Sequence, residues 1–161
     1  MLETQRLVYL HGLESTSQSG KARQFADRYP GMLTPDFSGS FEQRMQQLLP
    51  ILADHTGWTL IGSSYGGLMG AAFTHDHSSQ VRKLILLAPA ITLPEFASRP
   101  DLHPLSVPTV LIHGRQDDIV PPEPVRLLAG RLFTDLTYIP VDDGHRLPKA
   151  FLELDWDQIL A

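Results

Sequence analysis

Short apolar runs alternate along the chain with segments of helical composition, and this order is the strongest constraint on the fold. We interpret as strands the runs at residues 7–10, 32–35, 58–62, 81–88, 109–113 and 136–141. Segments between them, such as 41–55 and 65–75, are predicted to be helical. Strands that alternate with helices predict a mostly parallel sheet with helices on both faces. We therefore expect an α/β fold of about six strands, with functional sites at the carboxyl ends of the strands.

The size and composition of the chain exclude several classes of protein. Its 161 residues are the length of one domain, so we expect a single domain over residues 1–161. The 13 Lys and Arg residues against 18 Asp and Glu give a formal net charge of −5, which disfavours nucleic acid as a partner. The chain contains no cysteine, so disulfides, thiolate metal sites and cysteine nucleophiles are excluded. A hydroxyl nucleophile is then the natural candidate.

The sequence offers no membrane or export signal. No stretch approaches the roughly 20 apolar residues that a membrane-spanning helix needs. The first residues lack a basic segment followed by an apolar one. We expect a soluble, cytoplasmic protein that has no membrane partner.

The pentapeptide Gly62-Ser63-Ser64-Tyr65-Gly66 has the pattern Gly-x-Ser-x-Gly and joins a predicted strand to a predicted helix. In this context the pattern predicts a nucleophile elbow, a tight turn that exposes the middle serine. Glycine is expected on both sides because the strained turn brings backbone so close that a Cβ would clash. Ser64 is therefore the candidate nucleophile. The alternative is an ordinary turn rich in glycine and serine.

A serine hydroxyl is a weak nucleophile, so it needs a histidine base that a carboxylate orients. His145 follows the last apolar run, and we expect its loop to open on the same edge of the sheet as Ser64. Asp117 and Asp118 follow the run at 109–113, and either carboxylate could reach a histidine. The alternatives are a solvated loop histidine and an exposed acidic turn.

Two backbone N–H groups are candidates to hold the oxyanion of a tetrahedral intermediate. The N–H of Tyr65 lies at the start of a predicted helix, where N–H groups have no partner inside the helix. The second donor should come from the loop after the first strand, where Gly12 allows a close approach and the N–H of Leu13 is available. The alternative for this loop is a simple turn that ends the strand.

Four motifs together resemble the α/β-hydrolase superfamily. They are His11-Gly12, Gly-Ser-Ser-Tyr-Gly-Gly at 62–67, His-Gly-Arg-Gln-Asp-Asp-Ile-Val-Pro at 113–121 and Asp143-Gly144-His145. The resemblance spans nearly the whole chain and is greatest to small bacterial esterases and acyl-thioesterase-like hydrolases. It implies Ser64, Asp117 and His145 as a catalytic triad in the family's chain order, with Leu13 and Tyr65 as oxyanion donors. Asp117 is preferred to Asp118 because Gly-x-x-Asp-x-x-Val-Pro is the family's spacing.

The sequence departs from larger members of this superfamily in two ways. Few residues precede the first strand, where antiparallel strands usually open the sheet, and no cap domain follows the run at 81–88. We therefore expect a trimmed α/β-hydrolase core without a cap. The proline-rich loop at 89–108 takes the place of the cap, and we expect its Ile91, Leu93 and Phe96 to form part of a substrate pocket. The alternative is ordinary loop packing.

Other motifs are set aside. The segment 15–22 imitates a phosphate-binding loop but lacks the first glycine and the Ser or Thr that would hold Mg²⁺. His75 and His77 diverge on a helix and have no third ligand evident in the sequence, so we predict no metal. His11 and His113 each precede a glycine at a strand end, and we interpret them as hydrogen-bonding residues that orient loops.

The sequence thus predicts a serine hydrolase that cleaves carboxylic esters of small or medium acyl groups through an acyl-enzyme intermediate. Its partner would be a small-molecule acyl ester, and no cofactor is expected. Two alternatives stay open. One is an acyl-thioesterase with the same triad, and the other is a non-catalytic binding module with the hydrolase fold.

Overall fold

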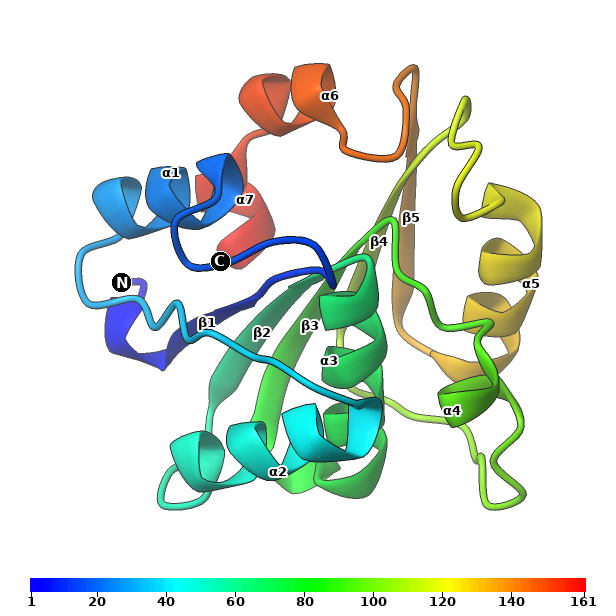
Figure 1. Ribbon diagram of the computed structural model, residues 1–161, viewed down its shortest axis with the longest axis horizontal. Helices are drawn as coiled ribbons and strands as arrows, with labels where there is room; N and C mark the ends of the chain where they lie inside the picture. Colours follow the sequence, from blue (N-terminus) through cyan, green and yellow to red (C-terminus); the bar gives the residue numbers. More distant parts are fainter.

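The computed structural model describes residues 1–161 and contains a parallel sheet between two layers of helices (Figure 1). The strands are β1 (Leu7–Leu10), β2 (Trp58–Ser63), β3 (Val81–Leu87), β4 (Thr109–Gly114) and β5 (Leu136–Val141). They lie in the sheet in chain order, and each pairs in parallel with the next. All carboxyl ends therefore meet at one edge of the sheet, where sites form in folds of this kind.

Helices cover both faces of the sheet. They are α1 (Gly20–Arg28), α2 (Phe41–Leu52), α3 (Tyr65–Asp76), α4 (Pro94–Ala97), α5 (Pro122–Leu132), α6 (Pro148–Glu153) and α7 (Trp156–Leu160), with the 3-10 helices η1 (Thr4–Arg6) and η2 (Ser78–Gln80). One apolar cluster packs α2, α3 and α5 against one face, and a second packs α1, α6 and α7 against the other (Figure 1). Successive strand residues alternate between the clusters, so Leu60 joins the first and Ile61 the second. None of the helices is long and apolar enough to cross a bilayer.

The sheet has five strands where we expected about six. The segment at 32–35 forms only an isolated bridge between Leu33 and Val8. The N–H of Leu33 donates to the carbonyl of Leu7, and the N–H of Tyr9 donates to the carbonyl of Leu33, both at 2.9 Å. Pairing goes no further because the next residue of the chain that could donate to β1 is Pro35, which has no N–H.

Helix α2 ends at Leu52, before the predicted end at His55. The carbonyl of Leu52 accepts hydrogen bonds from Trp58 Nε1 at 3.0 Å and from Gln80 Nε2 at 3.1 Å. The last carbonyls of a helix lack partners inside it, and here side chains from β2 and η2 donate to the carbonyl of Leu52. Tertiary contacts therefore set the end of this helix.

Candidate active site

Ser64 lies in the tight turn between β2 and α3. Its φ and ψ angles are 55° and −112°, a conformation that residues with a side chain rarely adopt. A Cβ on Gly62 would lie 2.7 Å from the Cα of Gly67, and one on Gly66 would lie 2.5 Å from the carbonyl carbon of Leu10. Backbone packing on both sides of the serine therefore requires glycine.

Neighbouring backbone holds this strained turn in place. The N–H of Ser64 donates to the carbonyl of Leu87, and the carbonyl of Ser64 accepts from the N–H of Ala90, each at 2.9 Å. Strained conformations persist only where the surrounding structure determines them. Here the end of β3 and the residues after it supply that support.

The side chains of Ser64, His145 and Asp117 form one hydrogen-bonded chain. His145 Nε2 lies 3.0 Å from Ser64 Oγ, and His145 Nδ1 lies 2.8 Å from Asp117 Oδ2. The three residues follow β2, β5 and β4, so the parallel sheet brings them to one edge. Because the carboxylate accepts, Nδ1 carries the hydrogen and Nε2 is free to accept from the serine hydroxyl. Such a chain makes a serine nucleophilic. Asp118 is exposed and makes no bond to His145.

The carboxylate of Asp117 is buried and fully hydrogen-bonded. Its side chain has no exposed surface. Oδ1 accepts from the N–H groups of Ile119 at 2.9 Å and Val120 at 2.8 Å. Burial raises the pKa of this carboxyl, but the hydrogen bonds from His145 and from the two backbone N–H groups outweigh it and lower the pKa below its ordinary value. Asp117 therefore remains ionised at neutral pH.

His113 makes a contact with Asp117 that sequence reasoning missed. His113 is buried on β4, and its Nε2 lies 2.8 Å from the carbonyl oxygen of Val120 and 3.1 Å from Asp117 Oδ2. Because a carbonyl can only accept, Nε2 carries the hydrogen and shares it between carbonyl and carboxylate. Its Nδ1 is left buried without a partner, which an apolar residue would avoid. The sequence signal for this contact is that His113 is a polar residue in the apolar run at 109–113 and precedes Asp117 by four positions.

The loop that carries His145 packs directly on the end of β4. A Cβ on Gly114 would lie 2.8 Å from the carbonyl carbon of Asp143, so only glycine permits this approach. The Asp143 carboxylate accepts from the N–H of Gly144 and from two N–H groups at the start of α6, at 2.8 to 2.9 Å. Burial raises the pKa of Asp143, but these backbone hydrogen bonds together lower it by more, so the pKa lies below its ordinary value. The carboxylate thereby fixes the loop that joins β5 to α6.

The loop after β1 passes beside Ser64. A Cβ on Gly12 would lie 3.6 Å from the Cβ of Ser64, which is an ordinary contact rather than a clash. His11 fixes this loop, because its Nε2 accepts from the N–H of Phe37 at 2.9 Å and its Nδ1 donates to the carbonyl of Gly12 at 2.7 Å. His11 thus orients a loop, as we expected from the sequence.

The backbone N–H groups of Leu13 and Tyr65 are both free of internal partners. That of Leu13 donates no hydrogen bond within the protein. That of Tyr65 is the first in α3 and has no acceptor inside the helix. Both residues adjoin the nucleophile region, one from the loop after β1 and the other from the elbow.

A cleft of about 1300 Å³ opens at Ser64. One wall is the loop after β1 with the first turns of α1, and the other is the His145 loop with α6. Most of the lining residues are polar, and besides Ser64 they include the uncharged side chains of Ser15, Thr16, Gln18, Ser19, Gln24 and Ser63. The cleft gives a substrate access to the serine.

Three residues that we expected in a substrate pocket do not line this cleft. Ile91 and Phe96 are completely buried in the apolar cluster that includes α3 and α5. Leu93 is exposed, but it lies outside the cleft. The loop at 89–108 folds against the helices beside it, so its apolar side chains complete the core instead of a pocket. None of the three expected residues therefore lies at the cleft that opens at Ser64.

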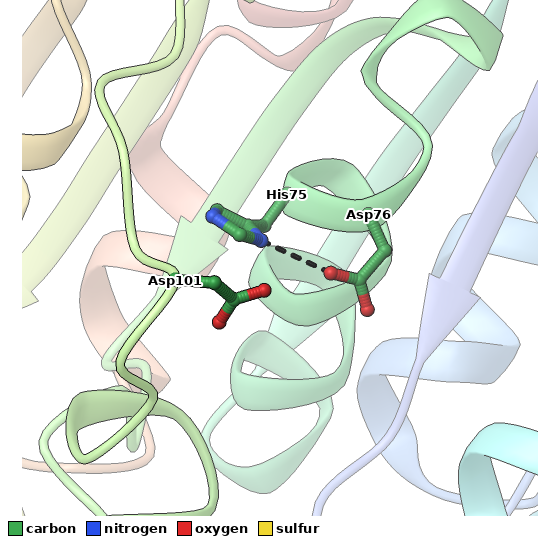
Figure 2. A group of neighbouring side chains, drawn as sticks. All are labelled: His75, Asp76 and Asp101. Atoms are coloured by element: carbon green, nitrogen blue, oxygen red, sulfur yellow. Dashed lines mark hydrogen bonds and ion pairs between the residues drawn. The ribbon is translucent and has the colours of Figure 1, made fainter.

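A second group of histidine and aspartate side chains lies at the far end of α3 (Figure 2). His75 Nδ1 lies 3.0 Å from Asp76 Oδ1, and with Asp101 the candidate ligand atoms lie within 4.8 Å of one another. Sequence reasoning missed the third member because Asp101 belongs to the loop at 89–108. Arg99 Nη1 lies 2.9 Å and 3.1 Å from the two carboxylate oxygens of Asp76. The Arg99 guanidinium thus pairs with the Asp76 carboxylate, and this ion pair ties the loop to α3.

Comparisons with known proteins identify a family and a fold. The model of the FSH1 serine hydrolase family matches residues 39–155, which is more than half of the chain and includes Ser64, Asp117 and His145. A comparison with curated proteins gives no match.

Solved structures with the same arrangement cover nearly the whole chain. Alpha/beta hydrolase domain-containing protein 10 from mouse has a TM-score of 0.80 at 20% identity, over 99% of this chain and 89% of that one. A hydrolase of the alpha/beta superfamily from Xanthomonas campestris has a TM-score of 0.73 at 27% identity, over 91% and 90%. The monoacylglycerol lipase of Paleococcus ferrophilus has a TM-score of 0.72 at 16% identity, over 96% and 91%. These similarities show the α/β-hydrolase fold.

Proposed function

Since the chain belongs to the FSH1 family of serine hydrolases, we propose that it hydrolyses carboxylic esters of small or medium acyl groups with Ser64 as nucleophile. Family and fold make it an esterase-like serine hydrolase. The single observation that carries the proposal is the hydrogen-bonded chain from Ser64 through His145 to Asp117 at the floor of an open cleft.

In the proposed reaction, Ser64 Oγ attacks the ester carbonyl while its proton passes to His145 Nε2. The ionised Asp117 stabilises the imidazolium that forms. Collapse of the tetrahedral intermediate expels the alcohol, which takes the proton from His145. Water then attacks the acyl-enzyme with His145 again as base, and the acid leaves.

The free N–H groups of Leu13 and Tyr65 are the proposed oxyanion donors. The Tyr65 N–H opens α3, so the partial positive charge of the helix N-terminus adds to its effect. Gly12 beside Ser64 supports the second donor, because it places the following peptide near the nucleophile. Loss of one such donor lowers kcat by about 10²–10³-fold in comparable enzymes.

The type of ester is supported by two observations. The cleft is open and no inserted domain covers it, so a compact acyl ester can reach Ser64 from solvent. One structural relative is a monoacylglycerol lipase, whose name denotes cleavage of a carboxylic ester.

Labelling with a fluorophosphonate probe tests the activated serine without assuming a substrate. We expect one adduct, located by mass spectrometry on Ser64, and much slower labelling of His145→Ala. The neighbouring Ser63 also lines the cleft, so Ser63→Ala is the matched control and should label normally. Folded protein that stays unlabelled, or that is labelled elsewhere, would contradict the proposal.

A panel of 4-nitrophenyl esters with acyl chains of increasing length tests the substrate. We expect turnover of the short and medium esters and none by Ser64→Ala. Thioesters of the same acids serve as the comparison, and a preference for them would move the assignment to the thioesterase alternative.

A further inference from the structure

Lys21 carries a positive charge in an unfavourable position that the proposed chemistry does not use. It is the second residue of α1, whose first turn contains no acidic residue. The N-terminus of a helix carries partial positive charge, so a cation there is disfavoured. The side chain is partly buried and lines the cleft that opens at Ser64.

No carboxylate forms a salt bridge with this charge. The Nζ of Lys21 donates to the backbone carbonyl of Arg146 and lies 5.7 Å from the centroid of the Phe151 ring. Burial lowers the pKa of Lys21, the Arg146 guanidinium lowers it further, and Asp143 raises it by less. Lys21 forms no salt bridge.

Arg146 provides a second uncompensated cation on the same wall of the cleft. It follows His145 directly, lines the cleft and also forms no salt bridge. Arg146 is exposed and Lys21 is partly buried, and the Arg146 guanidinium lies close enough to lower the pKa of the Lys21 ammonium through like-charge repulsion. An anion between them would relieve it.

The acidic residues of the cleft do not fill this role. The carboxylate of Asp143 is occupied by three backbone N–H groups. Glu14 and Asp118 are exposed, and neither pairs with a cation. The rest of the polar lining is uncharged, with hydroxyl and amide groups that can donate to an oxyanion.

We propose that the cleft binds esters that carry a second, oxyanionic group, a carboxylate or a phosphate, and that Lys21 and Arg146 bind this group. The inference rests on the proposed function and names its substrate class. Because Arg146 adjoins His145, the anionic group and the scissile ester would occupy one cleft. The net charge of −5 opposes anions at long range, but salt screens that field over about 8–10 Å, whereas the two cations act at contact.

Matched ester pairs test the inference. The first pair is the mono-4-nitrophenyl ester of glutaric acid and its methyl-capped neutral analogue. The second pair is an ester whose alcohol carries a phosphate and the same ester without the phosphate. We would compare kcat/KM within each pair. We expect the anionic member of at least one pair to be preferred by about tenfold or more, through KM, as for one charge-assisted hydrogen bond. The pair that shows the preference identifies carboxylate or phosphate.

Variants of the lysine separate charge from structure. Lys21→Met should remove the preference, measured as the ratio of kcat/KM between the two members of each pair, and Lys21→Arg should restore that ratio. Lys149 is an exposed lysine outside the cleft, so Lys149→Met is the matched control. Equal kcat/KM for both members of each pair, or a preference that survives Lys21→Met, would overturn the inference.

A binding measurement distinguishes failure of this inference from failure of the proposed function. Calorimetric titration of the wild-type protein with monomethyl glutarate and with glycerol phosphate requires no hydrolysis. Binding that Lys21→Met abolishes and Lys149→Met preserves would support the anion site even if no ester were cleaved. Absence of binding by either ligand, together with turnover of neutral esters, would refute the anion site and leave the hydrolase intact.

Discussion

Helix α3 has a histidine–aspartate pair at each end, and the two pairs differ in what surrounds them. At its N-terminal end His145 joins Asp117 to the hydroxyl of Ser64 in an open cleft. At its C-terminal end His75 contacts Asp76 (Figure 2), and the Asp76 carboxylate also pairs with Arg99. The Nε2 atom of His75 has no hydrogen-bond partner, unlike that of His145. The same residue types therefore give a reactive arrangement only where the second ring nitrogen faces a nucleophile.

The carboxylates also differ in how they are held. The pKa of both Asp117 and Asp76 lies below its ordinary value, so the pKa alone does not distinguish them. The Asp117 side chain has no exposed surface and accepts from backbone N–H groups, whereas the Asp76 side chain is 39% exposed and accepts from an arginine. A backbone-bound carboxylate is fixed in place, while a surface ion pair competes with water.

Removing the nucleophile should give the largest difference between the two ends of α3. We expect Ser64→Ala to lower kcat for a neutral ester by about 10⁶-fold, as in comparable serine hydrolases. His75→Ala should leave kcat unchanged, because the far group takes no part in the reaction. Steady-state kinetics on both variants measures this, and a fall in kcat for His75→Ala would break the comparison.

Asp117→Asn tests the orienting carboxylate. The amide cannot stabilise an imidazolium and favours the wrong histidine tautomer, so kcat should fall by about 10⁴-fold. Asp76→Asn is the matched change at the other end and should keep full activity. Comparable losses in the two variants would show that the carboxylates have similar roles.

His113 offers a finer test of how Asp117 is positioned. His113→Leu removes the donor to Asp117 Oδ2 and should lower kcat about tenfold with little change in KM. His113→Gln keeps an N–H and should retain most of the activity. Leucine removes the unpartnered Nδ1 but also the donor to the carbonyl of Val120, so the melting temperature is measured beside kcat to separate a loss of stability from a loss of positioning. Identical kcat values in the two variants would exclude a positioning role.

The smallest effect is expected from the surface ion pair. Asp76→Asn breaks the contact with Arg99, and we expect a loss of about 0–1 kcal/mol in the free energy of unfolding. Urea denaturation measures it, with EDTA-treated wild type beside it. A larger loss, or a stability that falls with EDTA, would mean that the group at the end of α3 does more than tie down a loop.

The parts of the fold that were predictable depend on local sequence. Five of the apolar runs became strands, and the glycines of the elbow flank a serine whose strained φ is local to that turn. The run at 32–35 did not, because Pro35 ends its pairing with β1, and only the path of the chain past β1 shows that Pro35 stands where a donor is needed. Neither hydrophobic periodicity nor composition predicts such a path.

Side-chain contacts across the cleft and core were not predictable in the same way. Ile91 and Phe96 are apolar whether they line a pocket or complete the core, and only packing decides between these. Two contacts form only in the assembled fold. His113 meets Asp117 at the end of β4, and Lys21 of α1 meets Arg146 of the loop between β5 and α6. Order along the chain indicated the residues at the strand ends, but not their supporting partners.

The isolated bridge at Leu33 also bears on how separate molecules meet. An open strand edge is a template on which another chain can add a strand and begin to aggregate. On β1, Leu33 already takes up the outward carbonyl of Leu7 and the N–H of Tyr9. On β5, the opposite edge, Pro140 has no N–H to donate. The segment at Leu33 thus blocks the edge strand β1, and Pro140 hinders pairing along the edge strand β5. Both edges of the sheet therefore resist pairing with a strand of another molecule.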